Sequence, residues 1–148
     1  MKLVKEAISF ERGNNPMKNL GLGRKNLIEK WLNEMMIEDY NIKDDYTIDA
    51  LKGNVIDLSF KNLFYFPEYI QFNKVDGHFF CNNNHLISLK GSPIFVGRDF
   101  DCSDNNLFSL EYCPLEVRWG LDCSKNPGKF IKENVLKYCK IEKNRIKC

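Results

Sequence analysis

Val96-Gly-Arg-Asp-Phe-Asp-Cys-Ser-Asp-Asn-Asn-Leu107 is one of four related segments between residues 54 and 126. Each segment contains a short unit in which apolar and polar residues alternate. The four units are Ile56-Asp-Leu-Ser59, Phe79-Phe-Cys-Asn82, Phe100-Asp-Cys-Ser103 and Leu121-Asp-Cys-Ser124. The last three begin 21 residues apart, so this part of the chain is an internal repeat.

Other positions keep the same spacing of 21 residues. They are the cysteines Cys81, Cys102 and Cys123, the asparagines Asn84, Asn105 and Asn126, and the valines Val75, Val96 and Val117. The first unit differs from the others, because it has Leu58 in the cysteine place and Lys61 in the asparagine place and is two residues longer. Such a departure suits a terminal unit that has solvent on one side.

The alternation within each unit indicates a short strand. Phe100 and Cys102 would lie on one face of the strand and Asp101 on the other, because successive side chains of a strand point to opposite faces. One unit cannot bury its apolar face alone, so equivalent strands should stack in parallel into one continuous sheet.

A period of 20 to 29 residues with the pattern apolar-x-apolar-x-x-Asn-x-Leu is typical of leucine-rich repeats. The sequence therefore predicts an α/β repeat fold, a short leucine-rich-repeat solenoid of about four coils over residues 53–128, with a helical cap at each end. Asn84, Asn105 and Asn126 should form a ladder, because a side-chain amide both donates and accepts hydrogen bonds at a turn that no neighbouring strand can reach.

Two parts of the sequence carry a resemblance to known proteins. The segment from Val96 to Glu111 resembles the degenerate leucine-rich repeats of short proteins encoded by large tailed phages and prophages. The opening stretch from Leu3 to Pro16 resembles a leader attached to varied proteins of crAss-like gut phages. The resemblance implies a phage-encoded protein and brings no catalytic motif.

The chain before the repeats divides into two parts. Residues 1–23 read as an irregular arm, either a loosely packed leader or a docking peptide anchored by Phe10, Arg12 and Leu20. Residues 24–52 predict a capping helix and an entry strand. The helix would begin at Asn26 as N-cap, with Glu29 three residues later, and run to about residue 37. The entry strand would lie at residues 46–48.

After the repeats, residues 129–148 predict a second capping helix and a basic tail. Ile131, Val135, Leu136, Tyr138 and Cys139 recur at helical spacing and should cover the last coil. The tail from residue 142 to 148 should be frayed or form a short edge strand.

Composition narrows the range of function classes. The chain has 148 residues, 43% of them hydrophobic and 28% charged, and a net charge of +2, as in an ordinary single-domain protein. No apolar run approaches 18 residues, and Lys2, Lys5 and Glu6 stand where a signal peptide needs its apolar core. We therefore expect no membrane association, and a protein that stays in the reducing cytoplasm of the host bacterium or is packaged in the virion.

The six cysteines have two interpretations. Three of them share one inward repeat position, where reduced thiols pack as small apolar groups. Stacked strands also bring equivalent cysteines within disulfide distance, so a bridge or a soft-metal site stays open, although no Cys-x-x-Cys pair is present. We expect no cofactor and no resident metal.

The outward face of the sheet holds the candidate binding residues, namely Asp57, His78, Phe80, Asp99, Asp101, Trp119 and Asp122. Its aspartates either serve solvation alone or form a concave acidic surface with aromatic anchors for a basic segment of another protein. Calcium is a weaker option, because no EF-hand or nonapeptide motif is present.

No phosphate loop, carboxylate pair or nucleophile-base set is present, so the sequence does not favour an enzyme. The preferred hypothesis is a non-catalytic protein-protein interaction module. The alternatives are a virion structural or cargo protein addressed by its leader and, third, association with nucleic acid through the basic stretch from Lys129 to Lys147. That stretch lacks the aromatic residues of a stacking platform, so nucleic acid is the least favoured partner.

Overall fold

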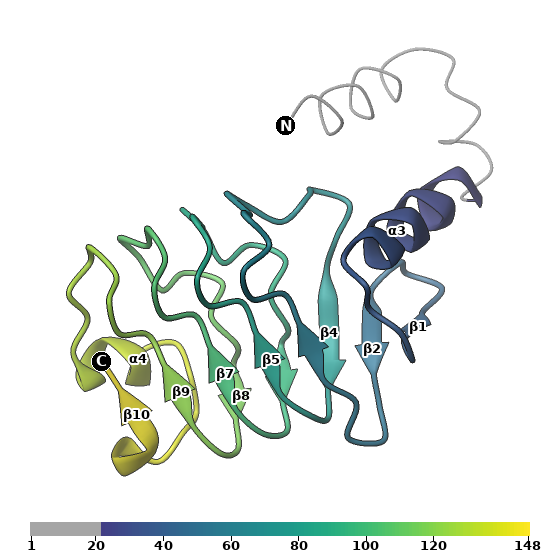
Figure 1. Cartoon of the computed structure of the whole chain (residues 1–148). Helices are drawn as coiled ribbons and strands as arrows, with labels where there is room; N and C mark the ends of the chain where they lie inside the picture. The colour runs from purple at the N-terminus through teal and green to yellow at the C-terminus, as the bar shows by residue number, and fades with distance from the viewer. Residues whose placement is uncertain (1–21) are drawn as a thin grey trace.

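The computed structural model describes residues 22–148 and forms a parallel β-solenoid of about five turns with little helix (Figure 1). The turns stack side by side, from helix α3 at one end to α4 and β10 at the other. The helical elements are α3 (Leu22–Glu34), α4 (Lys132–Leu136) and the 3-10 helix η1 (Lys143–Arg145). The strands are β1 (Asn41–Ile42), β2 (Ile48–Ala50), β3 (Ile56–Asp57), β4 (Phe72–Val75), β5 (Phe79–Phe80), β6 (Phe95–Val96), β7 (Phe100–Asp101), β8 (Glu116–Val117), β9 (Leu121–Asp122) and β10 (Ile146–Lys147).

The strands form two sheets, whereas the sequence analysis predicted one. We call them sheet A, with order β1-β2-β4-β6-β8, and sheet B, with order β10-β9-β7-β5-β3. Only the pair β1 and β2 is antiparallel. Sheet B is the predicted sheet of alternating units. Sheet A arises because the valines that share the 21-residue period form strands of their own, with Val75 paired to Val96 and Val96 to Val117.

A sharp corner joins the two strands of each turn, and in four turns it contains a glycine, namely Gly53, Gly77, Gly97 and Gly120. The N–H of Gly97 donates to the carbonyl oxygen of Val75 at 2.8 Å. A Cβ atom at Gly97 would overlap the carbonyl oxygen of Asp76 in the preceding turn. Gly77 is equally close to the backbone of Asn54. The absence of a side chain therefore lets the corners of neighbouring turns approach closely.

The core is the predicted inward column of sheet B together with the valines of sheet A. Phe79 and Phe100 are fully buried, and their rings stack at 5.7 Å between centroids. Cys81 and Cys102, two residues further along the chain, are also fully buried. Full burial of a large apolar side chain contributes about 1.5–3 kcal/mol, so this column is a main source of stability.

Helix α3 covers the first turn, as predicted for the N-terminal cap. Ile28, Trp31 and Leu32 are buried, and the Trp31 ring meets Phe66 edge-on at 6.5 Å. The predicted start was wrong, because the helix already includes Leu22 and Asn26 is an exposed residue inside it.

The entry to the solenoid also differs from the prediction. The strand expected at residues 46–48 begins only at Ile48, because Tyr46 has a positive φ of 67° and belongs to a turn. The short strand β1, which was not predicted, pairs with β2 and covers the free edge of sheet A. The proposed arm residues Phe10, Arg12 and Leu20 lie outside the described residues.

The C-terminal part contains a fifth turn as well as a cap. Helix α4 has five residues, and only Val135 and Cys139 of the predicted apolar face are buried, whereas Ile131, Leu136 and Tyr138 are exposed. Strand β10 then pairs in parallel with β9 and extends sheet B, so of the two predicted states of the tail the edge strand is the one found. Between residues 22 and 148, no helix has both the length and the apolar character needed to cross a bilayer.

Candidate binding surface on sheet B

The outward aspartates are shaped by their own sequence neighbours. In three turns an Asp stands two residues before a Ser, and the Ser backbone N–H and hydroxyl both donate to Oδ1 of the Asp. The pairs are Asp57 with Ser59, Asp101 with Ser103 and Asp122 with Ser124, with hydrogen bonds of 2.5–3.0 Å. One carboxylate oxygen therefore closes the turn after the strand, and only Oδ2 is left to meet another molecule.

The strand register places these aspartates in one row across sheet B. The row runs Asp57, Phe80, Asp101, Asp122 and Lys147. Only Asp101 and Asp122 are direct neighbours, because Phe80 separates Asp57 from the other two. At the end of the row, Lys147 Nζ lies 3.3 Å from Oδ2 of Asp122.

The position of Lys147 at the end of this row was not predicted from the sequence. Its signal was present, because Ile146-Lys147-Cys148 repeats the apolar-x-Cys pattern of Leu121-Asp122-Cys123. This repeat was not recognised in the sequence because it begins 25 residues after the preceding unit, whereas the other units are 21 residues apart. The row therefore carries its own cation at one end.

Partial burial makes one carboxyl group of this row, that of Asp101, harder to ionise. Burial raises the pKa of Asp101 above its ordinary value, and the neighbouring Asp122 carboxylate raises it further. The hydrogen bonds from Ser103 and the charge of Lys147 lower it in part. A cation brought to Asp101 would thus stabilise a carboxylate that is poorly solvated in the free protein.

An aromatic cluster lies next to the row. The His78 ring stacks on Phe80 at 5.1 Å and meets Trp119 edge-on at 5.6 Å. The guanidinium of Arg98 lies over the Trp119 ring at 5.1 Å from its centroid. Trp119 is nevertheless 51% exposed. The indole is therefore held by its neighbours and still offers much of its surface to solvent.

His78 and Asp99 form the polar edge of this cluster. Oδ2 of Asp99 lies 3.2 Å from Nδ1 of His78, and the Asp99 backbone N–H donates to the same nitrogen at 3.3 Å. Beside them is an open hollow of about 430 Å³, lined by Asp99, Trp119, Gly120 and Arg145. The structure thus places all seven predicted surface residues on one face, and Asp57 contacts the rest of the set only through its register neighbour Phe80.

The predicted asparagine ladder is present and buried. Asn105 Oδ1 accepts from the Leu86 N–H at 2.9 Å, and its Nδ2 donates to the carbonyl oxygens of Cys81 and Cys102 at 2.9 and 3.1 Å. Asn84 and Asn126 bond the neighbouring turn in the same way. Each amide thus joins two turns, and the ladder is structural.

A second exposed surface was missed by the sequence analysis. Phe64, Ile87 and Phe108 are 54%, 64% and 77% exposed and hold equivalent positions in three turns, one residue after the buried leucine position of each turn. We call them the apolar row. The ring of His85 stacks on Phe64 at 4.9 Å. Their regular spacing after the repeat leucines was the available signal.

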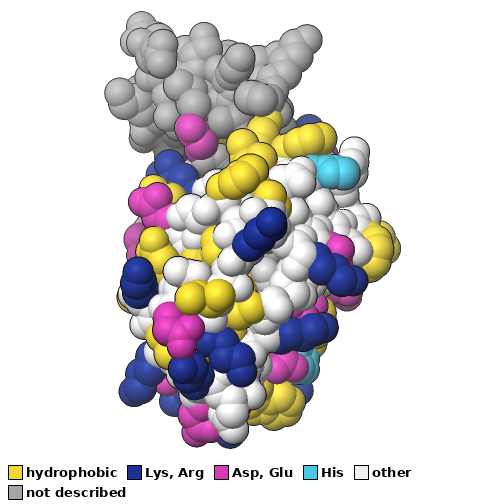
Figure 2. All heavy atoms as spheres, turned by 90° about the vertical axis from the view of Figure 1, so that its left-hand side faces the viewer, with side chains coloured by type: hydrophobic (Ala, Val, Ile, Leu, Met, Phe, Trp, Pro, Cys, Tyr) yellow, Lys and Arg dark blue, Asp and Glu magenta, His cyan; other side chains and the backbone are white. Residues whose placement is uncertain are grey.

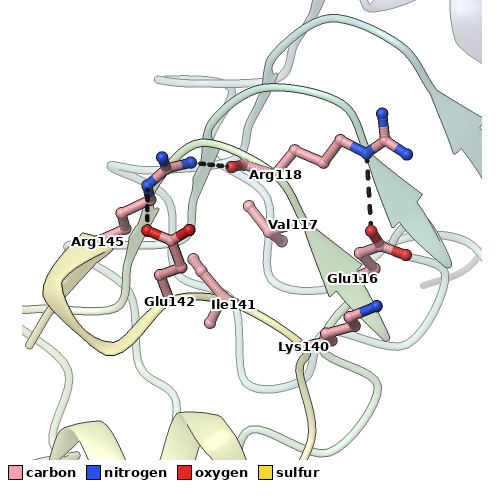
Figure 3. Close-up of a pocket in the computed structure, with 7 residues that line it drawn as sticks. All are labelled: Glu116, Val117, Arg118, Lys140, Ile141, Glu142 and Arg145. Atoms are coloured by element: carbon pink, nitrogen blue, oxygen red, sulfur yellow. Dashed lines mark hydrogen bonds and ion pairs between the residues drawn. The ribbon is translucent and has the colours of Figure 1, made fainter.

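The C-terminal turn bears another hollow, of about 330 Å³, between sheet A and the tail (Figure 3). Figure 3 shows both of its arginines paired, whereas the ammonium group of Lys140 has no partner among the residues drawn. Arg145 Nε lies 3.2 Å from Glu142, Arg118 Nε lies 3.6 Å from Glu116, and Arg145 Nη1 donates to the Arg118 carbonyl oxygen. These pairs stabilise the fifth turn and leave little unpaired charge for a ligand.

The C-terminal end of the molecule shows Lys and Arg side chains interspersed with acidic and hydrophobic ones (Figure 2). Three basic residues of this end are in ion pairs, namely Lys143 with Glu133, Arg145 with Glu142, and Lys147 with Asp122. Across residues 22–148, no three His, Cys, Asp or Glu side chains are grouped so that they could hold a metal ion.

Comparisons with protein-family models, with curated proteins and with solved structures found no significant match. The class that the fold itself defines is the parallel β-solenoid.

Proposed function

We propose that this chain is a non-catalytic protein-interaction module built on leucine-rich repeats, with the outward face of sheet B as its binding surface. The exposed but fixed indole of Trp119 carries the proposal. An aromatic side chain that is already held in place loses little conformational freedom on binding, and Trp and Arg are enriched among residues that dominate interface energies.

The leucine-rich-repeat class rests on the 21-residue period and on the buried asparagine that follows β5, β7 and β9 of sheet B. Stacked repeats expose an extended sheet face, which such proteins use to bind other macromolecules. In this chain that face is sheet B, whose outward row holds three aspartates together with Phe80 and Lys147.

The partner that fits this surface is a basic segment of another protein. Lys147 on Asp122 illustrates how an ammonium group sits against the carboxylate row. In residues 22–148, no cation is paired with Oδ2 of Asp57 or Asp101 at ion-pair distance. A partner with Lys or Arg near Asp101 and an apolar side chain against Trp119 would contact both the aspartate row and the aromatic cluster.

The test begins with affinity capture from infected host cells and identification of the bound proteins by mass spectrometry. Binding of the identified partner is then measured for the wild type and for Trp119→Ala, with Phe108→Ala in the apolar row as the matched control. We expect Trp119→Ala to weaken binding at least about tenfold, mainly through faster dissociation, and Phe108→Ala to bind like the wild type. If Phe108→Ala weakens binding and Trp119→Ala does not, the interface lies on the apolar row and the proposal for sheet B is wrong.

A virion role is the second proposal, and it rests on the resemblance of residues 3–16 to a phage leader. Deleting residues 1–21 tests it, because the core contacts of α3 begin at Ile28 and the solenoid should still fold. Loss of the deleted protein from purified particles, with unchanged thermal unfolding, would support an address in the leader. Equal incorporation of both forms would refute it.

Nucleic-acid association remains the third proposal. The ion pairs of Lys143, Arg145 and Lys147 argue against it, because paired cations release fewer counterions when they meet phosphate. Binding to mixed-sequence DNA or RNA should therefore be weak at physiological salt.

A further inference from the structure

Strand β10 adds a fourth cysteine to the inward column of sheet B. Its register sets Ile146 against Leu121 and Lys147 against Asp122, so the next residue, Cys148, follows opposite Cys123. The two sulfur atoms are 3.8 Å apart. Neighbouring strands lie about 4.8 Å apart, which is within the range of about 4.4–6.8 Å between the Cα atoms of a disulfide.

We propose that Cys123 and Cys148 form a reversible oxidation site, at which a small-molecule disulfide converts the two thiols into one bridge that fastens β10 to β9. This inference is independent of the proposed function, because it rests only on the register and the sulfur contact.

Exposure selects this pair among the six cysteines. Cys148 is exposed, whereas Cys81, Cys102, Cys113 and Cys139 are all buried. Cys81 and Cys102 are also stacked in register, but burial raises the pKa of both thiols and shields them from an oxidant. Cys113 and Cys139 are likewise buried, with 5% and 3% of their surface exposed. An oxidant in solution therefore meets Cys148 first.

The reaction proceeds by two thiol-disulfide exchanges. The Cys148 thiolate attacks one sulfur of the small disulfide, forms a mixed disulfide and releases one small thiolate. The Cys123 thiol then gives its proton to the released thiolate, and its sulfur attacks Sγ of Cys148 and expels the second small thiolate, which takes up the proton that Cys148 lost on ionising. In total, two protein thiols and one small disulfide become one protein disulfide and two small thiols.

The environment of Cys123 sets the order of events. Burial, together with the neighbouring Cys148, raises the pKa of Cys123 to about 12. Its thiolate is therefore scarce at neutral pH, and the second exchange should be slower than the first. The mixed disulfide at Cys148 should accumulate before the bridge appears.

The test uses the full chain, first reduced and then freed of reductant, with glutathione disulfide as the probe. Samples are alkylated, digested and analysed by mass spectrometry over time. We expect a glutathione adduct on Cys148, followed by a peptide that links Cys123 to Cys148 and a fall from six to four alkylated thiols in denaturant. Cys123→Ser should stop at the adduct, and Cys148→Ser should give neither product.

A second readout is thermal unfolding. The bridged form should melt about 10 °C higher than the reduced form, because cross-linking residues 25 apart restricts the unfolded chain. Addition of a thiol reductant should remove the increase. Cys139→Ser is the matched control and should form the same bridge.

Three results would overturn the proposal. They are a wild-type adduct that never resolves into a bridge, a bridge that joins a different pair of cysteines, and a covalent dimer through Cys148 in place of the internal link.

Discussion

Replacing Asn105 by alanine tests the ladder that joins the turns. The Asn105 side chain is 6% exposed and bonds four backbone groups from two turns. Alanine would leave the buried N–H of Leu86 without its acceptor. The carbonyl oxygens of Cys81 and Cys102 would each lose one of two amide donors and keep the other, from Asn84 and Asn126. No water can reach these groups while the turns stay stacked.

The size of the effect follows from these lost partners. An unsatisfied buried donor costs about 1–3 kcal/mol, and the two carbonyl oxygens, which have a second lone pair, add less. We expect Asn105→Ala to lower the free energy of unfolding by about 2–3 kcal/mol. In urea, the midpoint should fall by about 1–2 M.

The assay is urea unfolding followed by far-UV circular dichroism, with Asn106→Ala as the matched control. Asn106 is the exposed neighbour, and an alanine there should change stability by less than about 0.5 kcal/mol. Equal midpoints for the two variants would refute the reasoning.

A second variant separates hydrogen bonding from lost volume. Asn105→Asp keeps the oxygen that accepts from Leu86 but puts a carboxylate oxygen near the carbonyl oxygens of Cys81 and Cys102. It should be at least as unstable as alanine at neutral pH. It should recover at low pH, where the protonated carboxyl group can donate again.

Three further predictions concern other parts of the fold. Burial raises the pKa of Asp101 in the folded state. Protonated Asp101 therefore stabilises the folded protein fully at pH values below the unfolded-state pKa of about 3.9, and this stabilisation is lost as the pH rises through the folded-state pKa. The stability gain of Asp101→Asn over the wild type should therefore grow between pH 4 and 7 in urea titrations, and a constant difference would contradict it. Gly97→Ala should destabilise strongly in thermal unfolding because its Cβ would overlap the backbone of Asp76. Gly120→Ala should be milder, because its Cβ would be too close only to the side chain of Asp99 and would meet the Arg145 carbonyl oxygen at an ordinary contact distance. Equal losses for the two variants would count against the close corner. In the reduced native protein, Cys148 should react with a thiol reagent at once and Cys102 only after denaturation, and native labelling of Cys102 would disprove its burial.

Local sequence determines much of this protein. The alternation of Phe100, Asp101 and Cys102 assigns each side chain to a face, and the 21-residue period puts equivalent residues of successive turns in contact. The asparagine positions follow from the same period. These features are predictable because each turn repeats the same local pattern and meets the same neighbours.

Other features depend on contacts that no local pattern contains. Sheet A exists because the corner at Gly97 redirects the chain between two short strands, and the valines alone did not reveal the second sheet. Lys147 meets Asp122, and Cys148 meets Cys123, only because the segment through α4 returns the chain to the edge of sheet B after a spacing that breaks the period. The aromatic cluster likewise joins His78 and Trp119 from different turns. Such contacts depend on the tertiary structure. They form between residues of different turns, or between the stacked repeats and segments that do not follow the repeat, and no local pattern specifies how these pack together.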